Sequence, residues 1–177
     1  MDESQTEWRG AKVILRPFTE ADLTETYLGW LNDPEVVRFS NQRFTTHGRE
    51  SCRRYLQVFE GAENLFLLIQ CQATGRPVGT MTCYCSPPHG TVDMGILIGE
   101  KTFWGQGYGQ DAWDTLGTWW LQRGDVRKLT AGTVACNHGM IRLMERSGMA
   151  LEAVRKAQEI VEGELCDVLY YAKFNER

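Results

Sequence analysis

The segment WGQGYG, residues 104–109, places three glycines at alternate positions where a strand-like run meets a helix-like run. The apolar run TVDMGILI precedes it, and the helix-like segment QDAWDTLGTWWLQRG follows. Glycines at such a junction leave the main chain unshielded, so that another group can approach the backbone closely. We therefore expect this junction to lie at a binding site or at a tightly constrained turn.

Four kinds of structure compete for this loop. A dinucleotide-binding fingerprint needs a glycine where Gln110 stands and parallel strands around it, and a P-loop needs a Gly-Lys-Ser/Thr triplet that the loop lacks. A purely structural turn is the third candidate. The fourth is a pyrophosphate cradle, in which backbone N–H groups and the helix dipole face the anion. Glycines at positions 105, 107 and 109 favour the cradle, because larger side chains would block the phosphate oxygens.

The order of the expected elements is that of an α+β protein. Turn residues at 72–77 and 87–90 predict that three successive strands form an antiparallel meander. We expect strands over residues 12–17, 64–71, 78–86, 91–98, 126–135, 151–161 and 165–174. We expect helices from the cap Thr19 to Leu31 and over residues 47–61, 108–124 and 138–148. No linker or repeat interrupts this order, so one domain over residues 1–177 is predicted.

Composition excludes several classes of function. The chain has 177 residues, 42% of them hydrophobic and 24% charged, which suits one globular domain. Its net charge of −4 argues against a nucleic-acid partner, because a phosphate-backbone binder needs a basic surface. The local group Arg49, Arg53 and Arg54 is interpreted as a solvated helix face.

The cellular context follows from the N-terminal segment and the cysteines. The segment MDESQTEWRG is polar and acidic, unlike a secretory signal, and no apolar run approaches the roughly 20 residues that span a bilayer. We therefore expect a cytoplasmic protein without a membrane partner. The six scattered cysteines are expected to be core residues, and the three histidines show no metal-ligand spacing, so no metal is expected.

Several motifs in order resemble the GNAT superfamily of acyl-coenzyme A-dependent N-acetyltransferases. They are the strand TVDMGILI, the loop WGQGYG and the segment ACNHGMIRLMERSGM, with Gly107 and Gly109 matching the family's Arg/Gln-x-x-Gly-x-Gly/Ala loop. The opening segments LRPFTEADL and WLNDPEVVRF and the closing segment LEAVRKAQEIVEGELCDVLYYAKF are similar to the branch of ribosomal-protein N-terminal acetyltransferases. The resemblance spans almost the whole chain.

The resemblance implies a fold and a coenzyme site. It implies a mixed, mostly antiparallel central sheet with flanking helices, in which residues 94–98 splay from residues 129–135 and hold the pantetheine arm of acetyl-CoA in the gap. The implied coenzyme contacts come from the end of the splayed strand, the loop, the start of the next helix and a later asparagine: Ile96, Leu97, Ile98, Gly105, Gln106, Gly107, Tyr108, Gly109, Gln110 and Asn137. Asn137 is equally well placed to cap the helix that follows it.

Catalytic acid and base residues are less clearly marked. Asp93 is the first candidate for the base, since this branch often has an acidic residue there, and Asp33 and Glu35 are alternatives. Many family members carry a tyrosine that protonates the thiolate at the position of Met144. We therefore expect Tyr171 to serve as the acid, with Tyr170, Ser147 or a water as alternatives.

The predicted activity is acetyl-CoA-dependent N-acetylation of a primary amine. The acceptor classes left open are a protein N-terminus and a small amine, including an amino-sugar nucleotide, a polyamine or an aminoglycoside. An anionic sugar nucleotide would require arginines near the pocket, either Arg38 and Arg43 or the group on residues 49–54. A non-catalytic acyl-CoA-binding module is the alternative from another class, and a monomer or homodimer is expected.

Overall fold

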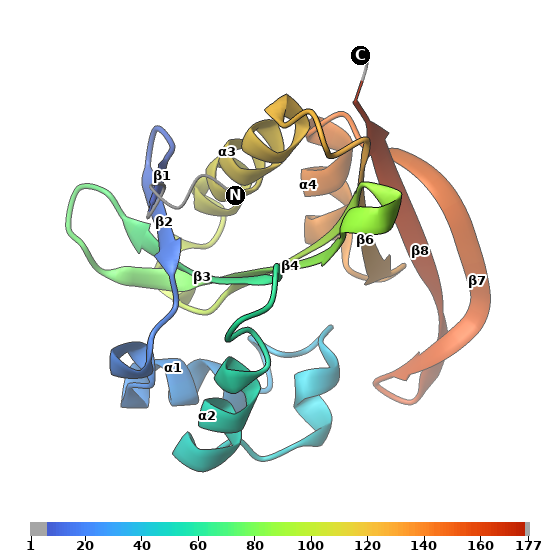
Figure 1. Cartoon of the computed structure of the whole chain (residues 1–177). Coiled ribbons are helices and arrows are strands. Elements are labelled where there is room, and N and C mark those ends of the chain that lie inside the picture. Colours follow the sequence, from blue (N-terminus) through green and yellow to red (C-terminus); the bar gives the residue numbers. More distant parts are fainter. Residues whose placement is uncertain (1–6, 176–177) are drawn as a thin grey trace.

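Eight strands form one sheet in the order β1-β2-β3-β4-β5-β6-β8-β7 in the computed structural model, which describes residues 7–175 (Figure 1). The strands are β1 (Trp8–Arg9), β2 (Val13–Pro17), β3 (Leu65–Cys71), β4 (Pro77–Ser86), β5 (Thr91–Ile98), β6 (Lys128–Val134), β7 (Ala150–Val161) and β8 (Glu164–Phe174). Neighbouring strands are antiparallel except for β5 and β6, which are parallel. The predicted mixed, mostly antiparallel sheet is confirmed.

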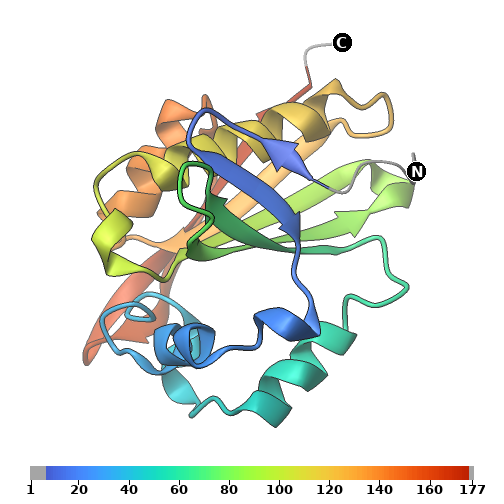
Figure 2. The same cartoon turned by 90° about the vertical axis from the view of Figure 1, so that its left-hand side faces the viewer.

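Four helices cover the two faces of this sheet. They are α1 (Glu25–Asn32), α2 (Arg49–Gln57), α3 (Tyr108–Gln122) and α4 (His138–Arg146). Helices α3 and α4 lie on one face, and α1 and α2 lie on the other, as both views show (Figures 1 and 2). We call these the α3/α4 face and the α1/α2 face.

Each face has its own apolar core, and the alternation along the strands assigns side chains to one or the other. In β3, Leu67 and Ile69 pack under α3, whereas Phe66 and Leu68 pack against α1 and α2. This strand is a continuous apolar run because it is buried on both faces. Trp113 of α3 is 2% exposed and is among the largest side chains of the α3/α4 core.

The helix predicted from Thr19 to Leu31 is wrong in its first part. A 3-10 helix spans Glu20–Asp22, and α1 begins only after a second cap, Thr24, whose hydroxyl accepts a hydrogen bond from the Tyr27 amide. The Asp22 carboxylate accepts hydrogen bonds from the amide and hydroxyl of Thr19 and pairs with Arg16. These contacts close the first turn on itself, so the chain starts a new helix.

Two larger differences from the expectation concern strand β1 and helix α2. Strand β1 was not predicted, because two residues are too few to show an alternating pattern. Helix α2 ends at Gln57, and Gly61, with a φ of 69°, lies in the turns beyond it. Neither difference changes the order of the remaining strands and helices.

Candidate active site

Strands β5 and β6 pair only at their beginnings and then separate. Their register joins Thr91 to Lys128, Val92 to Leu129 and Asp93 to Thr130. Within the part of the chain that the structure describes, no pair joins the two strands beyond Asp93. Residues 94–98 remain paired with β4 on their other side, so their inner edge is left with unpaired backbone groups. The predicted splayed pair is therefore present.

The glycine loop follows this open edge after one short 3-10 helix, Lys101–Phe103. Gly105 has a φ of 70° and Gly107 a φ of 83°, conformations that side chains rarely adopt. A Cβ on Gly105 would meet no atom within 4 Å, so the loop backbone there is accessible. The indole of Trp104 donates a hydrogen bond of 2.8 Å to the carbonyl of Ile98 and so holds the loop against the end of β5.

Position 109 requires glycine for a different reason, which is close packing. A Cβ on this residue would lie 3.3 Å from Ile98 and 3.6 Å from Leu143. Glycine therefore lets the first turn of α3 approach both β5 and α4 closely. Gln110 links α3 to the end of α4, because its side-chain amide donates a hydrogen bond of 2.7 Å to the Ser147 hydroxyl.

The turn between β1 and β2 also reaches the loop, which the sequence did not predict. The Lys12 ammonium donates a hydrogen bond of 2.7 Å to the carbonyl of Gln106 and lies over the Tyr108 ring. Asp111, in the first turn of α3, accepts from the amides of Ala11, Lys12 and Val13 at 2.8–3.0 Å. No local motif indicates this contact, since about 100 residues separate its two sides.

Asn137 is the cap of α4. Its side-chain oxygen accepts from the Met140 amide at 3.2 Å, and its nitrogen donates to the Thr133 hydroxyl at 3.1 Å. The capping role foreseen for this residue is present. Its position after the end of β6 places it beside the widening gap.

Asp93 is the last residue of β5 that pairs with β6. It faces the α1/α2 side, because its partner in β4 is Tyr84, which contacts Tyr55 and Phe59 of the α2 region. Asp93 accepts a hydrogen bond of 2.6 Å from Thr130. Although part of the side chain is exposed, desolvation of the carboxyl raises the pKa of Asp93, and the Thr130 hydrogen bond opposes that rise only in part.

Tyr171 lies on the opposite face of the sheet. Its partner in β6 is Ala131, one residue after the partner of Asp93, and its ring belongs to the α3/α4 core. The phenol donates a hydrogen bond of 3.2 Å to Glu145 of α4. Desolvation and this carboxylate raise the pKa of Tyr171, so the phenol stays protonated at neutral pH.

The alternative bases are engaged with other groups. The carboxylates of Asp33 and Glu35 both contact Lys101, at 2.8 and 2.7 Å. The hydrogen bond from Lys101 lowers the pKa of Asp33, which makes it a weaker base. The two residues therefore form a charged turn.

The alternative acids, Ser147 and Tyr170, also make other contacts. Ser147 bonds to Asp114 and Gln110 between α3 and α4, and the Tyr170 ring lies over Gly132. Met144, at the position where the family resemblance implies a tyrosine, is fully buried.

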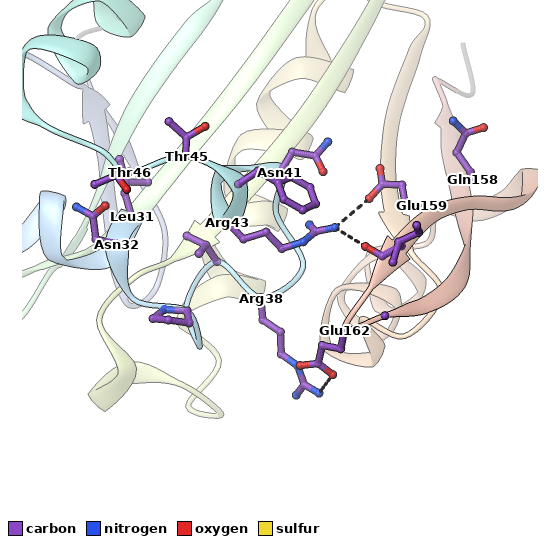
Figure 3. A pocket seen from close by; sticks show the side chains of 15 residues that line it. Leu31, Asn32, Arg38, Asn41, Arg43, Thr45, Thr46, Gln158, Glu159 and Glu162 are labelled. Carbon is purple, nitrogen blue, oxygen red and sulfur yellow. Dashed lines mark hydrogen bonds and ion pairs between the residues drawn. The ribbon is translucent and has the colours of Figure 1, made fainter.

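Two groups of arginines were candidates for contacting an anionic acceptor. Arg53 of α2 pairs with Glu20 and Glu50, as expected of a solvated helix face. Arg38 and Arg43 instead line an open pocket between the segment after α1 and the β7–β8 turn (Figure 3). The structure thus separates the two groups, and only the second borders a cavity of substantial size.

Among residues 7–175, no group of three or more histidine, cysteine, aspartate or glutamate side chains is arranged to hold a metal ion. No helix in that same part of the chain is long and apolar enough to cross a membrane.

Known structures share this fold along almost the whole chain. A GNAT family acetyltransferase from Bacillus anthracis superposes with a TM-score of 0.82 at 19% identity, covering 97% of this chain and 99% of its own. RimL, a ribosomal L7/L12 alpha-N-protein acetyltransferase in complex with coenzyme A, gives 0.79 at 21% identity, covering 93% and 94%. The Microcin C7 self immunity acetyltransferase MccE, in complex with acetyl-CoA and AMP, gives 0.79 at 18% identity, covering 93% of each chain.

These likenesses establish the fold, and the sequence itself establishes the family. No curated protein matches the sequence. The model of the acetyltransferase (GNAT) domain matches residues 12–150, which include the splayed strand, the glycine loop and Asn137. The chain belongs to the GNAT family of acetyltransferases.

Proposed function

We propose that this protein transfers an acetyl group from acetyl-CoA to a primary amine. The observation that carries the proposal is the unpaired inner edge of residues 94–98, which leads directly to a loop with positive φ at Gly105 and Gly107. The whole chain is proposed to act as one acetyltransferase domain. The acceptor is a protein N-terminus or a small amine.

The residues fit this coenzyme. The pantetheine arm contains amides, which pair with backbone groups, and the free edge at Ile96, Leu97 and Ile98 offers such groups in the gap. The pyrophosphate needs N–H donors, which residues 105–110 supply at the start of the 15-residue helix α3. Asn137 lies where the gap widens. These are the proposed coenzyme contacts, with Gln106 and Tyr108 held in place by Lys12.

The reaction needs two proton transfers. The amine nitrogen attacks the thioester carbonyl, a C–N bond forms, the C–S bond breaks, and the thiolate leaves. One proton must leave the amine, and one must reach the thiolate. Asp93 is the proposed base, because its raised pKa brings a carboxylate closer to neutral pH, where a general base is most effective.

Tyr171 is the proposed acid. It faces α3 and α4, the side on which the glycine loop begins its helix, whereas Asp93 faces the opposite side. Under this proposal the acid acts from the coenzyme side of the gap and the base from the acceptor side. Tyr171 is 4% exposed, and its hydroxyl donates to Glu145. To protonate the thiolate, the hydroxyl must exchange this contact.

The related structures support amine acceptors of different kinds. RimL is a ribosomal-protein N-terminal acetyltransferase, and MccE was solved with acetyl-CoA and AMP. Both protein N-termini and amines attached to nucleotides are therefore acceptors to be tested. An aminoglycoside is a further such acceptor, and a module that binds acyl-CoA without turnover is the competing function.

The deciding experiment is turnover with acetyl-CoA and a panel of N-terminal peptides, amino-sugar nucleotides, polyamines and aminoglycosides, followed by product mass. A product about 42 Da heavier than its acceptor, the mass gained when an acetyl group replaces a hydrogen, identifies the enzyme and its substrate class. Calorimetric binding of acetyl-CoA with no product from any acceptor would favour the non-catalytic module. Absence of acetyl-CoA binding would overturn the proposal.

A further inference from the structure

A pocket of about 1150 Å³ lies between the segment that follows α1 and the β7–β8 turn (Figure 3). Its volume exceeds the roughly 300–1000 Å³ typical of sites for drug-sized ligands. The pocket therefore has room for a substrate larger than a simple amine.

The pocket borders apolar clusters that reach the ends of β5 and β6. Leu31 lines the pocket and belongs to the apolar cluster against which Leu97 of β5 packs. Phe39, the neighbour of the lining residue Arg38, packs against the apolar cluster that contains Val134, the last residue of β6. A molecule in the pocket is therefore on the face where Asp93 lies and where an acceptor must meet the thioester.

An exposed aromatic ring stands in the pocket wall. Phe44 is 72% exposed, which is unusual for so large an apolar side chain. The guanidinium of Arg43 lies over the ring, 4.3 Å from its centre. An exposed ring of this kind offers a stacking surface for a flat base, a contact worth about tenfold or more in affinity. The side chain of Asn41 lines the same pocket and has the donors and acceptors that read a base edge.

Two arginines border the same space. Arg38 makes two hydrogen bonds of 2.8 Å to the carboxylate of Glu162. Arg43 donates to the carbonyls of Ser40 and Ile160 and lies 3.7 Å from Glu159. The backbone carbonyls fix the orientation of Arg43, while its contact with Glu159 is loose.

The Arg38–Glu162 ion pair is exchangeable, whereas the Arg43 side chain is 15% exposed and keeps its two backbone carbonyl contacts. The side chains of Arg38 and Glu162 are 50% and 61% exposed, and exposed pairs contribute little to stability. A phosphate carries more negative charge than a carboxylate and accepts the same two parallel hydrogen bonds from a guanidinium. The pocket disfavours a polycation, because its two acids, Glu159 and Glu162, are already paired with arginines.

We infer that this pocket binds a nucleoside diphosphate that carries the acceptor amine, with the base against Phe44 and the phosphates on Arg38 and Arg43. The inference rests on the proposed function and specifies its acceptor class. The amine is then delivered from the pocket to the gap between β5 and β6.

The test is calorimetric titration of the full chain with UDP, CDP, GDP and ADP in the presence of saturating coenzyme A. Saturation is essential, because coenzyme A itself contains an adenosine diphosphate and its site would otherwise bind one. At least one diphosphate should bind, and the matching nucleoside should bind more than tenfold more weakly. Arg43→Gln and Phe44→Leu should each weaken the diphosphate about tenfold, whereas the Kd of coenzyme A stays unchanged.

Arg53→Gln is the control, because Arg53 is an arginine paired with carboxylates, those of Glu20 and Glu50, but lies outside the pocket. It should leave nucleotide affinity unchanged. Coenzyme A binding with no diphosphate binding would overturn this inference and leave the proposed function standing. Diphosphate binding that the Arg43 and Phe44 variants do not weaken would also overturn it. Diphosphate binding sensitive to those variants in a protein that does not bind coenzyme A would support the pocket and overturn the proposed function.

Discussion

The ammonium group of Lys12 donates a hydrogen bond to the backbone carbonyl of Gln106, with 2.7 Å between the two atoms. In a trans peptide the C=O and N–H groups point in opposite directions, so this contact turns the amide of Gly107 away from Lys12. The first turn of the chain thereby orients a donor of the proposed pyrophosphate cradle.

Lys12→Met should weaken coenzyme A binding. Loss of one hydrogen bond worth about 1 kcal/mol corresponds to roughly a fivefold rise in Kd. Calorimetry measures this, and pantetheine, which lacks the phosphates, should bind both proteins equally. Lys156→Met, at an 81% exposed side chain of β7, is the control and should change neither Kd. Equal coenzyme A affinity in all three proteins would contradict the orienting role.

Gly107→Val should abolish coenzyme A binding. A valine at a φ of 83° is strained by about 1–3 kcal/mol, and its Cβ would lie 3.6 Å from the Lys12 ammonium that orients the cradle. Gly61→Val is the matched control, because Gly61 has a φ of 69° and no atom within 4 Å of its Cβ position. Both variants should lose similar thermal stability, but only the first should lose coenzyme A. Retained affinity in Gly107→Val would remove the cradle.

Asp93→Asn should lower kcat by about 100- to 10,000-fold if Asp93 is the base. It should not lower stability at pH 7. Desolvation raises the folded-state pKa of Asp93. The protonated carboxyl therefore favours the folded state below the unfolded-state pKa, and this stabilisation is lost as the pH rises through the folded-state pKa. The neutral asparagine does not suffer that loss. Unchanged kcat would make Asp93 a surface acid.

Thr130→Val should move the pH profile in a defined direction. The Thr130 hydroxyl stabilises the ionised Asp93 carboxylate, so its removal raises the pKa of Asp93 further. The acid limb of kcat/KM should therefore shift to higher pH. A shift to lower pH, or none, would show that Asp93 does not govern this limb.

Tyr171→Phe should lower kcat about 100-fold with little change in KM for acetyl-CoA, because it removes only the phenolic proton. Tyr170→Phe is the control, since Tyr170 faces the other side of the sheet over Gly132. Steady-state kinetics of both variants measures the difference. Equal and small effects would assign Tyr171 to the core alone.

Gly99→Ala should destabilise the protein by about 1–3 kcal/mol, because the new Cβ would lie 2.1 Å from the Trp30 ring. Gly29→Ala in α1 meets no atom within 4 Å and should stabilise by about 0.5–1 kcal/mol. Chemical denaturation at one pH measures both. Stability of Gly99→Ala equal to that of the parent would show that Trp30 is free to move away from the end of β5.

The sequence by itself determined the order of the major elements and the location of the loop. Strands β3, β4 and β5 are marked by apolar runs between turn residues, and β5 was predicted at its observed bounds, Thr91–Ile98. The reason is local, because alternation, turn chemistry and capping act within a few residues of one another. Local rules also misled, since the contacts of Asp22 with Thr19 and Arg16 split the first helix.

Only the tertiary structure decided which side chains meet. It placed Asp93 and Tyr171 on opposite faces of the sheet and gave Gly109 a packing role against Ile98. It also brought Lys12 to Gln106, and Arg38 to Glu162 across 124 positions of the chain. Such contacts depend on the register and crossing of distant elements, which the packing of the two apolar cores establishes and no short segment encodes.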